Sequence, residues 1–453
     1  MIKYLRFASI LFSGISFAGN IAHATSSQWN GTVLGFEKQR EGLLGDMMGI
    51  RPILKNNGFN YNLVYLNQMA YNVDGGYNND KHLAYIDQFS LTFTQDLEVL
   101  TGIPAARIEG NIVNRNHDDN LTIKRIRDPR VKSNDSTQES YGRGSITRLG
   151  WLTFSRDFDE NRLKWRIGMM SKMQTFDQAT PCDFQTLMLC GGKSANAFLW
   201  SNWNIHTWGS TFAYKLTPEL TLKTGIMEQN SKATDRSHAW SWSTKGSKGV
   251  ILPFEVEMRT HINNLPGVYN IGGFVSNATQ PDLYSGKSQP NGLTDLEGYK
   301  EYKRTLFFWS AANQQITQHS DDPNRGMSIG WNIGLGDQRS NYIHFATAAS
   351  LRYRGLFDAR PSDWIGIGVS YMDMSNHYRQ SQYQQNVISG INDYHNSRYK
   401  PVPDHSIDVE MYYRYLPVSW LELQPGIQFW HRPGGLNKTD DAWISSFKTM
   451  VYF

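Results

Sequence analysis

Residues 406–416 read SIDVEMYYRYL, and the side chains in this stretch alternate in character. The odd positions, from Ile407 to Tyr415, are apolar or aromatic, whereas the even positions include Asp408, Glu410 and Arg414. Successive side chains of a β-strand point to opposite faces, so the stretch predicts a strand with one apolar and one polar face. A wall between lipid and water needs such a strand.

The same alternation recurs along the chain, most clearly in residues 442–453, AWISSFKTMVYF, which end on Phe453. It also appears in 343–354, where Ile343 and Phe345 are predicted to share the apolar face, and in 420–430. About sixteen strands are predicted, an even number typical of bacterial outer-membrane barrels. Their predicted ranges are 60–73, 81–94, 104–115, 147–157, 162–171, 205–216, 219–228, 252–259, 267–277, 303–316, 327–335, 342–354, 364–374, 406–416, 419–429 and 442–453.

The connections between the predicted strands alternate in length. Those after odd strands are mostly long, and those after even strands are mostly short, such as 217–218 and 417–418. The exceptions are 336–341, which is short, and 317–326, which is long for its side. Outer-membrane barrels have long outer loops and short periplasmic turns, so the pattern predicts both chain ends in the periplasm. The long connections are 116–146, 172–204, 229–251, 278–302 and 375–405.

The composition is consistent with one large barrel. The 453 residues would suggest about three domains, but a single barrel can take up the whole chain. Aromatic residues reach 13% while mean hydropathy is only -0.51, as expected if the rings lie on the outer face and the inner face is polar. No apolar run of about 18 residues occurs beyond the first two dozen positions, which excludes a membrane protein built from helices. A net charge of +4 excludes a dedicated nucleic-acid binder.

The N-terminal sequence is typical of an export signal. Lys3 and Arg6 precede an apolar stretch, 7–18, and Ala22-His23-Ala24 offers a cleavage site, so 1–24 is predicted to be a signal peptide. Residues 25–58 are predicted to form a periplasmic segment with a short helix near 51–55, with Asp46 as candidate N-cap and Gly58 as its stop. This segment could plug the barrel or cap its end, and capping is favoured. Residues 59–453 form the predicted barrel domain.

The chain has two cysteines, Cys182 and Cys190. In an exported protein, two cysteines eight positions apart favour a local disulfide over a metal site. The sequence predicts neither a metal nor another cofactor.

Blocks of residues throughout the chain resemble the carbohydrate-selective porins of the OprB family. They include residues 43–52, LLGDMMGIRP, although that family usually has Trp and Gly in place of Met47 and Met48. The resemblance implies a sixteen-stranded outer-membrane channel for glucose and related sugars or sugar-derived solutes, working by facilitated diffusion. The other blocks are 181–185 with 190–192, 265–273, 355–368, and Glu410, Tyr412-Tyr413-Arg414, Pro417, Trp420-Leu421, Leu423-Gln424-Pro425 and Pro433-Gly434-Gly435.

A channel for an uncharged polyol should line its constriction with donors and acceptors that replace lost hydration. Arginine suits this task because its planar fork can bind neighbouring hydroxyls. The competing interpretation is that such charges merely stabilise the wall. Lower-ranked candidates for sugar stacking are Trp200, Trp203, Trp208, Trp240 and Trp242. The predicted pore-lining residues are Arg107, Glu109, Asn111, Lys164, Arg166, Glu255, Glu257, Arg259, Arg352, Arg354, Asp408, Glu410 and Arg414.

Other functions remain as alternatives. The arginines also suit a channel for sugar acids or other small organic anions, and the long loops could serve an adhesin or receptor. No G-x-S-x-G elbow or H-E-x-x-H motif is present, so an enzyme is not expected. The constricting loop is predicted to be 116–146 or, as second choice, 172–204. Expected partners are outer-membrane lipid and lipopolysaccharide, and the barrel-insertion machinery through Phe453, while the oligomeric state is left open.

Overall fold

A computed structural model describes residues 32–33, 36–37, 41–116, 120–139, 145–190, 200, 204–288 and 294–453. The predicted signal peptide and Trp203 lie outside the described residues. Among the described residues, no helix is both long enough and apolar enough to cross a membrane.

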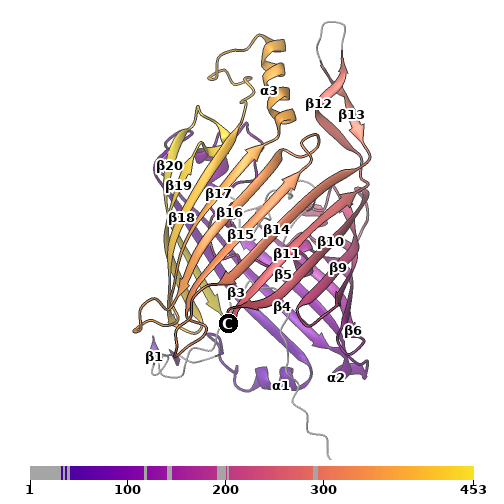
Figure 1. The fold of residues 1–453 in the computed structure, drawn as a ribbon, viewed down its shortest axis with the longest axis vertical. Helices are drawn as coiled ribbons and strands as arrows, with labels where there is room; N and C mark the ends of the chain where they lie inside the picture. The colour runs from indigo at the N-terminus through magenta and orange to yellow at the C-terminus, as the bar shows by residue number, and fades with distance from the viewer. Residues whose placement is uncertain are drawn as a thin grey trace, which may run out of the picture.

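Sixteen antiparallel strands form one closed barrel, and each contains or overlaps one strand predicted from the sequence. Each barrel strand pairs with the next barrel strand in the sequence, so that β11 pairs with β14. The sheet closes where β20 pairs with β3 (Figure 1). The barrel strands are β3 (Phe59–Gly76), β4 (Leu83–Asp96), β5 (Ala106–Asn116), β6 (Ile146–Phe158), β7 (Leu163–Met170), β8 (Thr207–Lys215), β9 (Leu220–Asn230), β10 (Ser247–Ile262), β11 (Leu265–Ser276), β14 (Thr305–Gln315), β15 (Gly326–Gly336), β16 (Ile343–Arg354), β17 (Trp364–Met374), β18 (His405–Val418), β19 (Leu421–His431) and β20 (Asp440–Tyr452).

Burial follows the predicted alternation. In β18, Glu410 and Arg414 are buried inside the barrel while Met411 is exposed on its outer face. Ile343 is an exception, because a bulge between it and Phe345 turns its side chain into an inner cluster with Met374. The prediction that Ile343 shares the apolar outer face with Phe345 is therefore wrong.

The two ends of the barrel differ, and we call them the loop end and the turn end. The loop end carries α3 (Asn376–Ser389) and the hairpin of β12 (Gln280–Ser288) and β13 (Thr294–Tyr302), both in segments predicted to be plain loops (Figure 1). The turn end carries α1 (Ile50–Asn56), α2 (Leu97–Thr101) and the C-terminus (Figure 1). The remaining short elements are β1 (Thr32–Val33), β2 (Phe36–Glu37), η1 (Thr122–Ile126), η2 (Lys172–Gln174), η3 (Leu187–Leu189), η4 (Arg236–His238) and η5 (Pro433–Gly435).

The N-terminal helix begins after Gly49, whose φ of 87° lies in the left-handed region. The Asp46 carboxylate does not cap α1 but accepts a hydrogen bond from the Met48 N–H in the preceding turn, at 3.1 Å, so the predicted cap is wrong. Gly58, also left-handed at φ 78°, follows the helix as predicted.

Residues 42–56 lie against the end of the closing strand. The Leu43 N–H donates to the Tyr452 carbonyl at 2.6 Å, and Arg51 Nη2 donates to the Phe453 carbonyl oxygen at 2.6 Å. The Arg51 guanidinium also lies 4.8 Å from the centroid of the Tyr61 ring. The segment thus packs on the rim of the barrel at the turn end, at the seam where the sheet closes.

Replacing Arg51 by Gln should loosen this contact, because it removes a charged hydrogen bond worth about 1.5–3 kcal/mol. We expect normal barrel assembly but several-fold faster proteinase K cleavage within residues 42–56. Lys55→Gln, on the exposed side of the same helix, is the matched control. Equal cleavage rates in the two variants would contradict the assignment.

Candidate functional site

Residues 171–190, here called the lumen loop, run along the inner wall from β7 to β18. Near its start, the Gln174 carbonyl accepts a hydrogen bond from Arg166 Nη1 on β7, at 2.6 Å. Further along, the Asp177 N–H donates to Glu255 on β10, at 2.7 Å. The described part of the second-ranked predicted loop, 172–190, therefore folds into the barrel.

Asp183 attaches the far part of the lumen loop to the wall. Its carboxylate accepts hydrogen bonds from Arg352 Nε at 2.5 Å and Nη2 at 2.8 Å, and from the Tyr412 hydroxyl at 2.5 Å. Its backbone carbonyl accepts from Gln424 Nε2 at 2.9 Å and from Lys448 Nζ. Burial opposes ionisation of Asp183, but the Arg352 guanidinium outweighs it and holds the pKa of this carboxyl below its ordinary value. The loop thus carries a charged anchor to four strands.

Glu410 binds the residues of the lumen loop that follow Asp183. Its two oxygens accept the backbone N–H groups of Gln185, at 2.8 Å, and Thr186, at 2.6 Å. On the neighbouring strand β17, a Cβ at Gly368 would lie 3.0 Å from Phe184 and 2.9 Å from Leu189. Glycine therefore allows the loop to lie close against β17. The disulfide that joins Cys182 to Cys190 closes this part of the loop on itself.

A second anchor lies on β10. Glu255 accepts from Lys223 Nζ at 2.8 Å and from Trp309 Nε1 at 2.9 Å, in addition to the Asp177 N–H. Within the loop, Lys172 pairs with Asp177 at 2.8 Å, and both side chains are almost fully buried. Buried charges are tolerated only when they are paired and hydrogen-bonded, as they are here.

The described part of the first-ranked loop, 120–139, also lies inside. The Thr137 carbonyl accepts from Gln428 Nε2 at 3.0 Å, and the Leu187 N–H donates to the Ser136 carbonyl at 2.9 Å. Asp408, predicted to line the pore, is buried and accepts from the Ser370 hydroxyl at 3.2 Å. The described parts of both loops therefore fold inward, and they touch one another.

Three predicted residues, Arg107, Glu109 and Lys164, keep partly exposed side chains inside the barrel. Together with Asp157, which was not predicted, they form a group on β5, β6 and β7 that we call the lumen patch. Arg107 pairs with Asp157 at 3.1 Å, and Glu109 lies 3.0 Å from Arg166 and 4.0 Å from Lys164. The Arg107, Lys164 and Glu109 side chains are 36%, 22% and 17% exposed, whereas those of Arg352 and Arg414 are 2% and 8% exposed. Of the predicted charged residues, only these three and Arg259 on β10 are open enough for a solute to touch.

The remaining predicted residues have other surroundings. Asn111 is fully buried and donates to the Ser90 and Thr92 hydroxyls, a contact within the wall. Arg354 is buried, and its guanidinium lies 5.8 Å from the Trp364 ring centroid. The other three form ion pairs on the inner face: Glu257 with Lys223 and Arg259, both at 2.7 Å, Arg259 remaining 59% exposed, and Arg414 with Glu422 at 3.5 Å.

Sequence reasoning missed the loop residues, above all Asp183. A period of two identifies wall residues, but an irregular loop has no period, and only the two cysteines and the family-like block 181–185 marked this segment. Glu139 lies near Cys182 and Cys190, but the two sulfurs are bonded to one another, so this cluster is not a thiolate metal site.

Asp183→Asn should release the lumen loop, because it leaves the buried Arg352 without its carboxylate, a change that costs about 3–5 kcal/mol in buried pairs. We expect the barrel to assemble and its single-channel current to become larger or noisier in planar bilayers. Asp159→Asn, in the exposed turn between β6 and β7, is the control and should behave as wild type. A quiet current of unchanged size in Asp183→Asn would show that the anchor does not set the aperture.

Comparisons with known proteins agree with this geometry. The family model described as carbohydrate-selective porin, OprB family, matches residues 80–453. Porin B of Pseudomonas aeruginosa is 32% identical over 440 residues, covering 96% of this chain and 94% of that protein. The putative porin QuiX of Acinetobacter baylyi is 31% identical over 428 residues, covering 92% of this chain and 94% of that protein. The high-pH structure of Pseudomonas putida OprB superposes with a TM-score of 0.88 at 32% identity, covering 92% of this chain and all of that one.

Proposed function

Because the chain belongs to the OprB family of carbohydrate-selective porins, we propose that it admits glucose and related monosaccharides by facilitated diffusion. Family membership and the closed barrel indicate an outer-membrane channel. In this proposal the loop end faces the outside, the turn end faces the periplasm, and residues 1–24 are removed after export.

The lumen patch is the observation that carries the proposal. A sugar that enters a narrow pore loses water, and its hydroxyls need both donors and acceptors in exchange. Arg107 and Lys164 supply donors, and Glu109 and Asp157 supply acceptors, all partly open to water. Because these charges pair with one another across 3–4 Å, a neutral solute can be bound weakly and released.

A selective channel also needs an aperture of fixed size, and the lumen loop provides it. Its anchors at Asp183, Glu410 and Glu255 join it to strands around much of the barrel. The buried charges there are engaged with protein groups and are therefore poor candidates for contact with solute. This division of roles favours transport over catalysis, since the exposed groups are already committed to ion pairs rather than arranged around a nucleophile.

A channel for sugar acids is the second candidate, favoured by the charge count when the buried Arg166, which pairs with Glu109, is added to the patch. Three cations, Arg107, Lys164 and Arg166, face two carboxylates, Glu109 and Asp157, which leaves 3 − 2 = +1. A net positive constriction attracts anions.

Liposome swelling with glucose, gluconate and an aromatic acid, together with reversal potentials in salt gradients, separates the two candidates. The leading proposal expects glucose permeation with weak ion selectivity. Strong anion selectivity without glucose permeation would overturn it in favour of the second candidate.

Arg107→Ala should alter glucose half-saturation by about two- to fivefold, because one hydrogen-bonding charged group contributes up to about 1 kcal/mol at a solvated site. Barrel assembly should be normal. Arg162→Ala, at the exposed turn before β7, serves as the control for charge removal. Identical concentration dependence in both variants would remove Arg107 from the solute path.

A further inference from the structure

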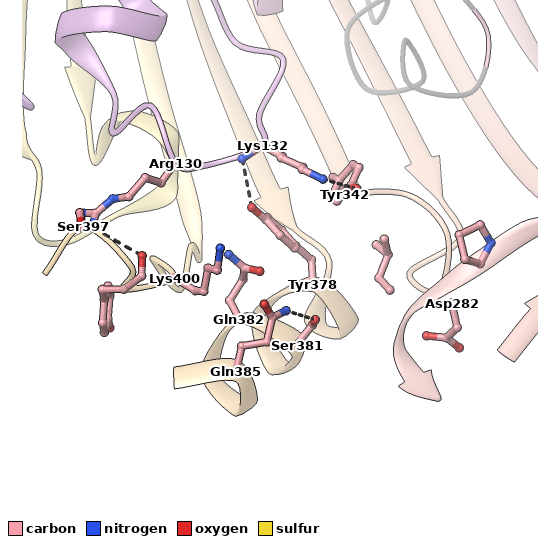
Figure 2. A pocket seen from close by; sticks show the side chains of 13 residues that line it. Arg130, Lys132, Asp282, Tyr342, Tyr378, Ser381, Gln382, Gln385, Ser397 and Lys400 are labelled. Atoms are coloured by element: carbon pink, nitrogen blue, oxygen red, sulfur yellow. Dashed lines mark hydrogen bonds between the residues drawn. The ribbon is translucent and has the colours of Figure 1, made fainter. Parts of the chain in front are cut away.

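A pocket of about 450 Å³ lies at the loop end, away from the lumen patch (Figure 2). Four segments distant in sequence form most of its wall: residues 130–132, the start of β12, α3, and residues 397–400. Its volume falls within the range of small-molecule sites.

The floor of the pocket consists of buried neutral polar groups on one face of α3. Tyr378, Ser381 and Gln382 are spaced three and four residues apart, so they share a face, and all three are buried. The Tyr378 hydroxyl accepts the Lys132 N–H at 3.0 Å, which ties α3 to the inward-folding loop 120–139 (Figure 2). Burial raises the pKa of Tyr378 to about 12, so the phenol stays neutral and able to hydrogen-bond.

The rim of the pocket is positive. Among its lining residues, Arg130, Lys132 and Lys400 are cations and Asp282 is an anion. Asp128 neutralises Arg130 at 2.6 Å, and Asp282 lies 2.8 Å from His377 Nδ1. Burial opposes ionisation of Asp128, but its hydrogen bonds with Arg130 hold the pKa of the carboxyl below its ordinary value, so this pair stays charged.

The two lysines face one remaining carboxylate, Asp282, among the lining residues, so the rim keeps a net charge of 2 − 1 = +1. Both are exposed, and neither forms an ion pair with a carboxylate of the described residues. Lys132 Nζ donates to the Tyr342 hydroxyl at 3.2 Å, which holds it at the rim. Lys400 is positioned through its backbone, because its N–H donates to Asn386 Oδ1 at 2.8 Å and its carbonyl accepts from Asn386 Nδ2 at 2.7 Å.

We propose that this pocket binds a small polyhydroxylated carboxylate, with the carboxylate at Lys132 and Lys400 and the hydroxyls on the polar floor. Gln382 is suited to a hydroxyl because its amide nitrogen has only a long contact, 3.5 Å, to the Pro401 carbonyl. A neutral polyol would leave both ammonium groups without an anion. A simple carboxylate would leave the amide and phenol groups of the floor unused.

This inference goes beyond the proposed function, since occupancy of the pocket does not require passage through the lumen. Its position at the loop end, joined to loop 120–139, makes it a capture site beside the entrance. Binding at an open, charged rim should be weak and should fall as salt rises.

Calorimetric titration of the full-length barrel in detergent tests the proposal, with gluconate, glucose and propionate as probes. We expect gluconate to bind at least about tenfold more tightly than either of the others. Lys400→Gln and Lys132→Gln should each weaken gluconate binding by roughly three- to fivefold, the range for exposed charge contacts. Lys245→Gln removes an exposed lysine from another loop at the same end and should change nothing.

Three results would overturn the proposal. The first is gluconate affinity unchanged in both pocket variants, and the second is equal affinity for gluconate and glucose. The third is binding of lipopolysaccharide at the two lysines without gluconate binding, which would favour a lipid contact. Glucose swelling rates of Lys400→Gln liposomes separate this test from the channel proposal, because they should equal the wild-type rates even if the pocket assignment fails.

Discussion

Hydrocarbon offers no hydrogen bonds, so every backbone N–H and C=O of a membrane-spanning strand needs a partner in the sheet. Closing β20 onto β3 meets this requirement, and the rest of the structure follows from it. Once the sheet is closed, alternate side chains face either lipid or the lumen, which puts carboxylates and guanidinium groups inside the barrel. The packing of residues 42–56 on Tyr452 and Phe453 reinforces the same seam.

Charges inside the barrel have two uses, and burial separates them. Where the lumen loop covers the wall, each charge must be paired, so Arg352 binds Asp183 and Glu410 binds backbone N–H groups. Near the turn end of β5 and β7, beyond the contacts of the lumen loop, Arg107 and Lys164 remain partly exposed. The loop thus separates structural charges from those that remain exposed, although all of these residues lie on the inner face of their strands.

The closed sheet and the lumen loop explain which features of the structure could be predicted from the sequence and which could not. All sixteen strands were predictable, because apolar and polar side chains alternate along stretches such as 406–416. Ile343 was misassigned because a bulge breaks the period without leaving a mark in the composition. Within the site, parity identified lumen-facing residues but could not distinguish Arg107, which is open to water, from Arg352, which is covered. That distinction depends on Asp183, whose place is set by an irregular loop and by contacts with residues more than 150 positions away. The hairpin β12–β13 and helix α3 were likewise hidden in segments predicted as loops, and with them the pocket at the loop end.

We propose that solute contacts the lumen patch and not the covered charges. The accessibility of single introduced cysteines to a charged, membrane-impermeant thiol reagent tests this proposal. Lys164→Cys should react quickly and be protected by glucose, whereas Ser370→Cys, a near-isosteric change at a buried lumen position beside Asp408, should react slowly with or without sugar. Fast, glucose-protected labelling at position 370, or labelling at position 164 that glucose leaves unchanged, would rule out this division between exposed and covered charges.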